Sequence, residues 1–233
     1  MLYVTTPINK VILNSLQLKN IDPQNERVNS MIMYSGGADS LSLAKSVLET
    51  TNHNVVIHHV VINNFEKRGQ FQLDVIDGQL DFLRKNCREF KFIKTTFEME
   101  LNNKHVGSSD VSVSLFMAGA ACRALRKYFS IIYTGHMSAT RMTDFIEASS
   151  ILNSLFTNNR FKPVWLYPMR SLGQSLEKRE IYKNIGKEGL AMTVSCRKPI
   201  VTGNQFTSCL KCHACKTREK TLRELGWDLS LVK

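Results

Sequence analysis

The sequence lacks the features of a membrane-spanning or secreted protein. No apolar segment reaches membrane-spanning length without charge, because the best candidate, residues 111–133, is interrupted by Arg123, Arg126 and Lys127. The first 19 residues show no basic start followed by an apolar core and a small-residue cleavage site. Low-complexity tracts and internal repeats are also missing. We therefore expect a folded cytoplasmic protein that has no membrane partner.

Long runs of positive charge are missing as well, although the net charge is +11. A basic surface attracts polyanions, so RNA or DNA has to be considered as a partner. However, the basic residues are scattered, and no block of five or six occurs. An enzyme with a cationic surface and anionic nucleotide substrates explains the charge more simply, so a nucleic-acid partner is not the favoured interpretation.

The apolar pattern alternates between the periods of strands and helices, which is typical of an α/β protein. Of the 233 residues, 43% are hydrophobic, enough for one sizeable domain or one domain with a small appendage. We expect strands at residues 31–34, 55–62, 89–97, 129–133 and 163–169, and helices at 39–50, 70–86, 111–128, within 137–161 and at 175–187. This alternation predicts a doubly wound parallel sheet. Residues 1–28 are expected to form a small strand or hairpin, because Pro7 and Pro23 bracket their apolar residues, and residues 102–110 are expected to form a loop.

One loop carries most of the functional signal. The strand at residues 31–34 runs into the sequence Ser-Gly-Gly-Ala-Asp-Ser at residues 35–40, and a helical apolar pattern follows at once. Gly36 and Gly37 allow unusual backbone conformations and leave no Cβ in the way of a ligand. The free amides of the following helix then form an anion site, for which phosphate is the usual guest. Asp39 and Ser40 can cap this helix or help to hold a metal-bound phosphate.

This loop resembles the Ser-Gly-Gly-x-Asp-Ser signature of the PP-loop ATP pyrophosphatase superfamily. The simpler alternative is an ordinary strand-to-helix turn that uses two glycines. The loop is not a Walker A sequence, because no Gly-Lys-Ser/Thr follows. The resemblance implies an adenylation reaction, in which ATP yields AMP and pyrophosphate, rather than hydrolysis of the γ-phosphate.

A second signal comes from the cysteines near the C-terminal end. Cys196 is followed by Cys209, Cys212 and Cys215, which form two overlapping Cys-x-x-Cys steps. In a cytoplasmic chain such clustering predicts a metal site, and four thiolates around Zn²⁺ make a closed structural site. An iron–sulfur cluster is a second interpretation, and a redox Cys-x-x-Cys pair is a third. Four nearby cations would offset the negative charge of the thiolates: Arg197, Lys211, Lys216 and Arg218.

Other histidines and cysteines are assigned to structure. His58 and His59 are neighbours on a strand and therefore point to opposite faces, so we expect them in the core or lining the site rather than sharing a metal. Cys87 and Cys122 lie in helical patterns and read as small buried side chains. His213 lies between two of the clustered cysteines and is expected to be a spectator.

Together these motifs resemble the QueC family, the 7-cyano-7-deazaguanine synthases. The shared points are the loop at residues 35–40, the strand that ends at Gly135, the Leu-x-Lys-x-x-Ile segment around Lys178, the Ser195-Cys196 pair and the Cys-x-x-Cys-x-x-Cys-x-x-Arg pattern at residues 209–218. They occur in the family's order over most of the chain. The resemblance implies an ATP-dependent ligase that adenylates the carboxylate of 7-carboxy-7-deazaguanine and converts it with ammonia to an amide and then a nitrile.

The resemblance also implies roles for individual residues. The residues that would bind ATP and Mg²⁺ are Ser35, Gly36, Gly37, Asp39, Ser40 and Gly135. Lys178 would stabilise the departing pyrophosphate and, with Asp39, would be catalytic, although it also fits a solvated helix lysine. Cys196, Cys209, Cys212 and Cys215 would hold structural Zn²⁺. Enzymes of this family are often homodimers, so a homodimer is also implied.

Two departures from the family pattern affect the expected substrate. The stretch after Gly135 and the residues before the helix near residues 110–115 both differ from the family's. A related carboxylate, or a nucleic acid or protein modified by the same adenylation chemistry, is therefore an alternative to the deazaguanine acid. We expect residues 1–190 to form the ATP-binding domain with a short N-terminal extension, and residues 191–233 to form a zinc-binding segment packed on it.

Overall fold

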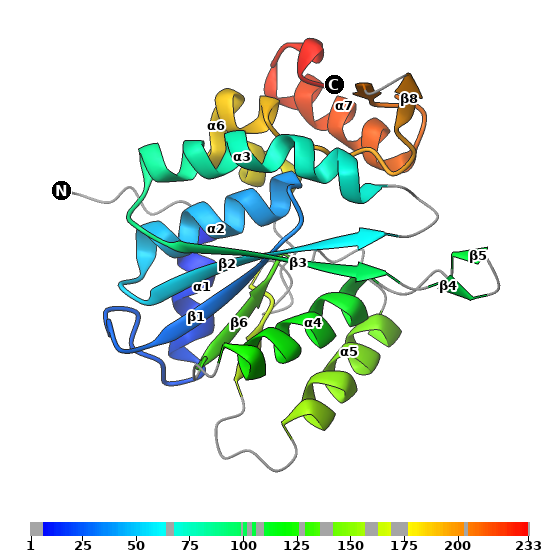
Figure 1. Ribbon diagram of the computed structural model, residues 1–233. Helices are drawn as coiled ribbons and strands as arrows, with labels where there is room; N and C mark the ends of the chain where they lie inside the picture. The colour runs from blue at the N-terminus through cyan, green and yellow to red at the C-terminus, as the bar shows by residue number, and fades with distance from the viewer. Residues whose placement is uncertain are drawn as a thin grey trace.

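A five-stranded parallel sheet forms the centre of the molecule (Figure 1). The computed structural model describes residues 7–63, 68–98, 100–101, 104–105, 110–125, 129–135, 142–156, 163–168, 177–202 and 205–232. The strands of the sheet are β1 (Asn29–Tyr34), β2 (Asn54–Asn63), β3 (Lys91–Glu98), β6 (Ile131–Thr134) and β7 (Val164–Leu166). Their order is β3-β2-β1-β6-β7. This arrangement confirms the predicted doubly wound α/β class.

Helices cover both faces of the sheet, and each face has its own core. On one face lie α1 (Pro7–Gln17), α2 (Ala38–Thr50), α3 (Arg68–Asn86) and α6 (Lys178–Ala191), whose apolar side chains pack with Ile32 and Ile57. On the other face lie α4 (Asp110–Ala124) and α5 (Met142–Leu155), which pack with Met31 and Met33. Successive residues of β1 thus serve opposite cores, as expected for a strand buried on both sides.

The remaining elements lie outside the main sheet. A short hairpin of β4 (Glu100–Leu101) and β5 (Lys104–His105) extends beyond the carboxyl end of β3 (Figure 1). A second hairpin of β8 (Ile200–Thr202) and β9 (Gln205–Thr207) precedes α7 (His213–Leu225) and the 3₁₀ turn η2 (Leu229–Val232). Leu222 of α7 joins the core on the α2 side of the sheet. No helix among the described residues is long and apolar enough to span a membrane.

The prediction of an N-terminal strand or hairpin was wrong, because residues 7–17 form α1. Ile8, Ile12 and Leu16 recur every four residues and are all buried, which is the spacing of one helical face. Pro7 occupies the first helical position, where a missing backbone N–H costs nothing. A proline that had been taken as a boundary of a strand therefore begins a helix.

Three further differences concern local structure. The polar stretch expected to be a loop contains β5, which pairs with β4 just before that stretch. The hairpin β8–β9 and helix α7 were not foreseen, although α7 ends as many helices do, with Gly226 in the left-handed region at φ 64°. Helix α6 begins at Lys178, and residues 169–176 lie outside the described residues.

His58 is fully buried on β2, where its Nε2 lies 2.8 Å from Oγ1 of Thr95. Burial, with a smaller contribution from His59, lowers the pKa of His58 from 6.5 to about 4. His59 lies on the opposite face, and its Nδ1 is 2.7 Å from the carbonyl oxygen of Tyr34. Both histidines are therefore core residues, and the expectation that they do not share a metal agrees with their separate partners.

The buried His58 should make stability depend on pH. In the unfolded chain the imidazole takes up a proton below about pH 6.5, whereas in the folded chain it stays neutral down to about pH 4. The stability that the neutral His58 contributes is therefore fully present above pH 6.5. This contribution falls by roughly 3 kcal/mol between pH 7 and pH 4. In urea unfolding across this range, the free energy of unfolding of His58→Gln should fall less steeply with decreasing pH than that of the unchanged protein. Equal pH dependences would contradict the lowered pKa of His58.

Candidate functional site

The loop at residues 35–40, named here the nucleotide loop after its predicted ligand, lies at the topological switch point of the sheet. Strand β1 pairs with β2 on one side and with β6 on the other, so chain connections leave in opposite directions at its carboxyl end. Gly36 adopts φ 76°, which favours glycine, and α2 begins directly after Gly37. Gly135 follows β6, and a Cβ there would lie 3.2 Å from the amide nitrogen of Ser40. The ends of β1 and β6 thus meet in close backbone contact.

Two serine hydroxyls hold the loop in shape. Oγ of Ser40 accepts a hydrogen bond from the amide of Ser35 at 3.2 Å and donates one to the carbonyl of Gly37 at 3.0 Å. Oγ of Ser35 lies 3.2 Å from that of Ser40 and accepts from the amide of Gly37. The first amides of α2 have no partner within the helix. The loop therefore presents backbone N–H groups at a helix N-terminus, the arrangement that binds phosphate.

Lys178 and Asp39 face each other across this loop. Nζ of Lys178 lies 2.5 and 2.6 Å from the two carboxylate oxygens of Asp39, and both side chains are about 30% exposed, at 30% and 27%. Helix α6 is fixed on α2 by Asn184, whose amide donates to Oγ of Ser42 at 2.9 Å and of Ser46 at 3.0 Å. The packing of α6 on α2 thus brings an ammonium group, 139 residues away in sequence, to the helix start.

A buried glutamine connects the loop to the C-terminal segment. Nε2 of Gln79, on α3, donates to the carbonyl of Gly36 at 2.9 Å and to that of Met192 at 2.7 Å. Its Oε1 accepts from the hydroxyl of Tyr34 at 2.5 Å. The amide of Val194 also donates to the carbonyl of Gly36, at 3.3 Å. The backbone at Gly36 is therefore held by both α3 and the segment after α6.

That segment is fixed from its other side by Arg218 of α7. The guanidinium is 2% exposed and donates to the carbonyls of Leu190 at 2.7 Å and Thr193 at 2.9 Å. It also reaches Oγ of Ser195 at 3.4 Å. Burial lowers the pKa of Arg218. Arg218 was expected as one of the cations around the cysteines, and in the structure its hydrogen bonds order the chain between α6 and Cys196.

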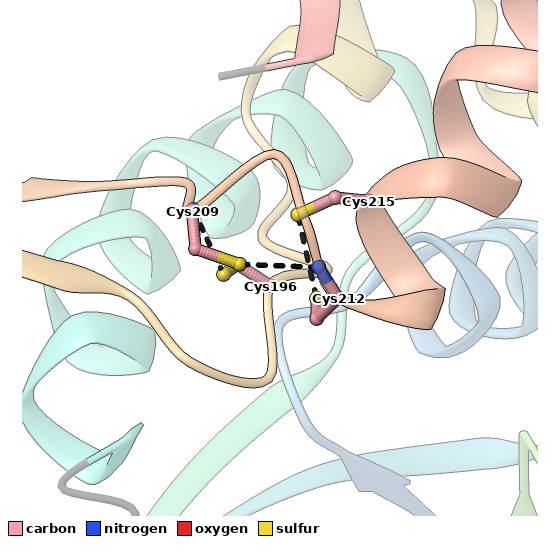
Figure 2. A group of neighbouring side chains, drawn as sticks. All are labelled: Cys196, Cys209, Cys212 and Cys215. Atoms are coloured by element: carbon pink, nitrogen blue, oxygen red, sulfur yellow. Dashed lines mark hydrogen bonds between the residues drawn. The ribbon is translucent and has the colours of Figure 1, made fainter.

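The four predicted cysteines come together in the structure (Figure 2). The sulfur atoms of Cys196, Cys209, Cys212 and Cys215 all lie within 4.8 Å of one another. Backbone amides donate to three of them: Cys209 N–H to the sulfur of Cys196 at 3.3 Å, Cys212 N–H to that of Cys209 at 3.3 Å, and Arg197 N–H to that of Cys212 at 3.5 Å. Such donors stabilise thiolates, which are the form that binds metal.

The dimensions of the cluster fit a single metal ion. With a metal–sulfur distance of about 2.3 Å, the sulfurs of a tetrahedral site lie roughly 3.8 Å apart. The observed separations of up to 4.8 Å are close to this value. In a cubane cluster each thiolate binds a separate iron, so its sulfurs have to lie farther apart than they do around one ion. Cys196 and Cys215 are buried and the other two are half-buried, which suits a structural site.

The turn between Cys209 and Cys212 contains an unusual residue. Leu210 adopts φ 57°, in the left-handed region that costs a residue with a Cβ roughly 1–2 kcal/mol. Its side chain is 58% exposed, so no burial offsets this cost. The amide of Lys211 and that of Cys212 lower the pKa of Cys209. The strained turn therefore directs backbone donors at a sulfur and leaves an aliphatic side chain on the surface.

The other two thiols are not suited to act as nucleophiles. Burial raises the pKa of Cys87 to about 11 and that of Cys122 to about 12. A thiol with so high a pKa is almost entirely protonated at neutral pH. Cys122 lies buried in α4, as predicted, whereas Cys87 is half-buried and lies just after the end of α3.

Sequence reasoning did not find Gln79, Asn184 or the buried role of Arg218. Gln79 carried a usable signal, since it lies between Ile76, Leu80 and Leu83 on the apolar side of α3, where a polar residue needs an internal partner. The altered stretch after Gly135 covers residues 136–144, of which 136–141 lie outside the described residues and 142–144 begin α5. Leu176 of the Leu-x-Lys-x-x-Ile segment also lies outside the described residues.

Comparison with solved structures identifies a protein that has the same fold. The U34-tRNA thiolase NcsA from Methanococcus maripaludis, solved with its [4Fe-4S] cluster, matches with a TM-score of 0.53 and 14% identity over 97% of this chain and 76% of that one. The chain has the fold of that protein. A "predicted subunit of tRNA methyltransferase" from Methanocaldococcus jannaschii matches with a TM-score of 0.37 and 13% identity over 88% and 91% of the two chains. No family model and no curated protein matches the sequence.

Replacement of Gln79 by leucine should destabilise the protein. Gln79→Leu removes the side-chain donor to the carbonyls of Gly36 and Met192 and the acceptor of the Tyr34 hydroxyl, which should lower the free energy of unfolding by at least about 2 kcal/mol. Urea unfolding measures the change. Gln24→Leu is the matched control, because Gln24 makes only an exposed contact with Asn52 and should cost less than about 0.5 kcal/mol. Equal effects of the two changes would contradict the proposed importance of the Gln79 contacts.

Proposed function

We propose that this chain is an ATP-dependent adenylating enzyme of the PP-loop type, which releases AMP and pyrophosphate. The observation that carries the proposal is the meeting of Asp39 and Lys178 at the loop of residues 35–40. An acceptor oxygen would attack the α-phosphorus of ATP, and the bond from that phosphorus to the bridging oxygen would break. The negative charge that develops on pyrophosphate would be stabilised by the loop amides and by the Lys178 ammonium.

Asp39 and Lys178 would have different roles in this reaction. A carboxylate next to a polyphosphate is repelled unless a cation lies between them. The Lys178 ammonium already lies against Asp39, and Mg²⁺ bound to the phosphates would take up the same carboxylate. We propose that Asp39 holds the cations in place, and that Lys178 shifts towards the leaving group when ATP binds.

The four cysteines would hold a structural Zn²⁺. A closed shell of four thiolates leaves no open coordination position for a substrate. The separations between the sulfur atoms support one ion over a cubane cluster. NcsA, which shares the fold, holds a [4Fe-4S] cluster, so the iron–sulfur interpretation is the alternative to test.

Two acceptor classes are proposed. The first is a small carboxylate, such as 7-carboxy-7-deazaguanine, which the resemblance to QueC enzymes favours and which ammonia would convert to an amide or nitrile. The second is a group on RNA, which is favoured by the fold shared with a tRNA thiolase. Neither Cys87 nor Cys122 is suited to act as a sulfur-transfer nucleophile, since burial raises the pKa of both thiols.

The adenylation proposal predicts that AMP and pyrophosphate form from ATP in the presence of an acceptor. Release of radiolabelled AMP should be measured with deazapurine acid plus ammonia, and separately with transfer RNA. Asp39→Ala and Lys178→Ala should each lower the rate at least about 100-fold, because each removes charge stabilisation of the leaving group. Lys183→Ala is the control, since the exposed Lys183 lies on the same helix but pairs with Glu180. Release of ADP and phosphate instead of AMP would contradict the proposal.

The metal proposal predicts one zinc and no iron per chain. Protein purified without oxygen should be analysed for both elements and for the visible absorption of an iron–sulfur cluster. Cys196→Ser and Cys212→Ser should each lose the zinc and lower the thermal midpoint, since metal-binding energy is folding energy at such a site. Cys122→Ser should retain the metal. A brown protein with about four irons would favour the cluster.

A further inference from the structure

The positive charge of this protein belongs to one half of the sequence. Residues 1–110 contain 12 Lys and Arg and 12 Asp and Glu, so their net charge is zero. Residues 111–233 contain 19 Lys and Arg against 8 Asp and Glu. The entire net charge of +11 is therefore carried by the second half. Such asymmetry between halves is a signature of a surface that binds a polyanion.

The strongest local excess surrounds the four cysteines. We name residues 192–218 the cysteine lobe; the sequence of this lobe contains no aspartate or glutamate. Lys198, Lys211 and Lys216 are all exposed on it. By contrast, several cations of α6 and α7 pair with acids on the same helix, such as Lys183 with Glu180. The lobe thus carries cations that no acid within it can neutralise.

The metal site explains only part of this charge. Four thiolates around one divalent ion carry a net charge of about −2. Backbone amides of Arg197, Cys209 and Cys212 already donate to the sulfurs and reduce their need for external cations. The exposed side chains of Lys198, Lys211 and Lys216 carry three positive charges, which exceed the remaining demand. The lobe therefore stays positive after its own thiolates are counted.

Two apolar side chains lie on the same lobe. Leu210 is 58% exposed and Ile200 is 53% exposed. Leu210 keeps its aliphatic side chain at a left-handed position that glycine would occupy without strain. A strained and exposed residue that adds no burial points to a role in contact with another molecule.

The cysteine lobe is also directly connected to the nucleotide loop. The amide of Val194, at the start of the lobe, donates to the carbonyl of Gly36, and a Cβ at Gly37 would lie 3.5 Å from the carbonyl oxygen of Val194. Val194 packs with Cys196 and Cys215 in one cluster. A polymer bound on the lobe could therefore place one of its groups at the loop where ATP would react.

We propose that the cysteine lobe binds RNA, with its lysines on the phosphate backbone and Leu210 and Ile200 against an unstacked base or ribose. The proposal rests on the adenylating function and names the partner that presents its acceptor. RNA is favoured over duplex DNA because single-stranded loops expose base faces to apolar side chains, whereas a duplex hides them.

The lysines can be tested by equilibrium binding of fluorescent transfer RNA at several salt concentrations, without ATP. The combined change Lys198→Gln, Lys211→Gln, Lys216→Gln should weaken binding at least 10-fold near 0.1 M salt and reduce the salt slope by about 2–3. The control is Lys10→Gln, Lys19→Gln, Lys85→Gln, which lowers the net charge equally at exposed positions of the neutral half. Equal effects of the two sets, or no binding by the unchanged protein, would overturn the proposal.

Leu210→Gly separates a contact role from a structural one. The change relieves backbone strain, so the thermal midpoint and the zinc content should not fall, while RNA binding should weaken several-fold. Unchanged binding would remove Leu210 from the proposed surface. Tighter binding of a duplex DNA of equal length than of transfer RNA would overturn the choice of RNA.

Failure of the RNA-binding proposal can be distinguished from failure of the adenylation proposal. Lys178→Ala should lose AMP release but keep the binding of transfer RNA, because binding is measured without ATP. Loss of AMP release with intact, lysine-dependent binding would support the RNA surface alone. Normal AMP release with a deazapurine acid and no RNA binding would overturn the RNA surface while leaving adenylation in place.

Discussion

The carbonyl of Gly36 is the point at which three parts of the chain meet. It accepts hydrogen bonds from the side chain of Gln79 on α3 and from the amide of Val194, while Gly36 itself continues β1 into the loop. Without these donors the carbonyl would be buried and unsatisfied, at a cost of about 1–3 kcal/mol. The shape of the nucleotide loop therefore depends on residues that do not face the expected ligand.

The same dependence extends from the loop to the cysteines. Arg218 fixes the backbone at Leu190 and Thr193, Gln79 fixes it at Met192, and Cys196 follows two residues after Val194. A displacement at the cysteines would be transmitted through this short, fully bonded segment to Gly36. A closed metal site is well suited to such a position, since it is rigid and does not exchange ligands with substrate.

The local patterns in the sequence predicted the fold class, the loop at the carboxyl end of β1 and the gathering of the four cysteines, because strand–loop–helix alternation and cysteine spacing are visible in nearby residues. The contacts between distant residues could not be read in this way. Asn184 meets Ser42, and Arg218 meets Leu190, only because helices pack as they do. The error at α1 had a different cause: prolines were given more weight than the four-residue spacing of Ile8, Ile12 and Leu16.

The ion pair between Asp39 and Lys178 has a consequence for the order in which the protein is made. The loop at residues 35–40 leaves the ribosome early, but its partners at positions 178 and 194 are synthesised much later. A nascent chain that has completed its first four sheet strands still carries an Asp39 carboxylate with no ammonium opposite it, and a Gly36 carbonyl without the Val194 amide. During synthesis the nucleotide loop therefore stays incomplete until the segment that leads into the cysteines has been made and has packed against it.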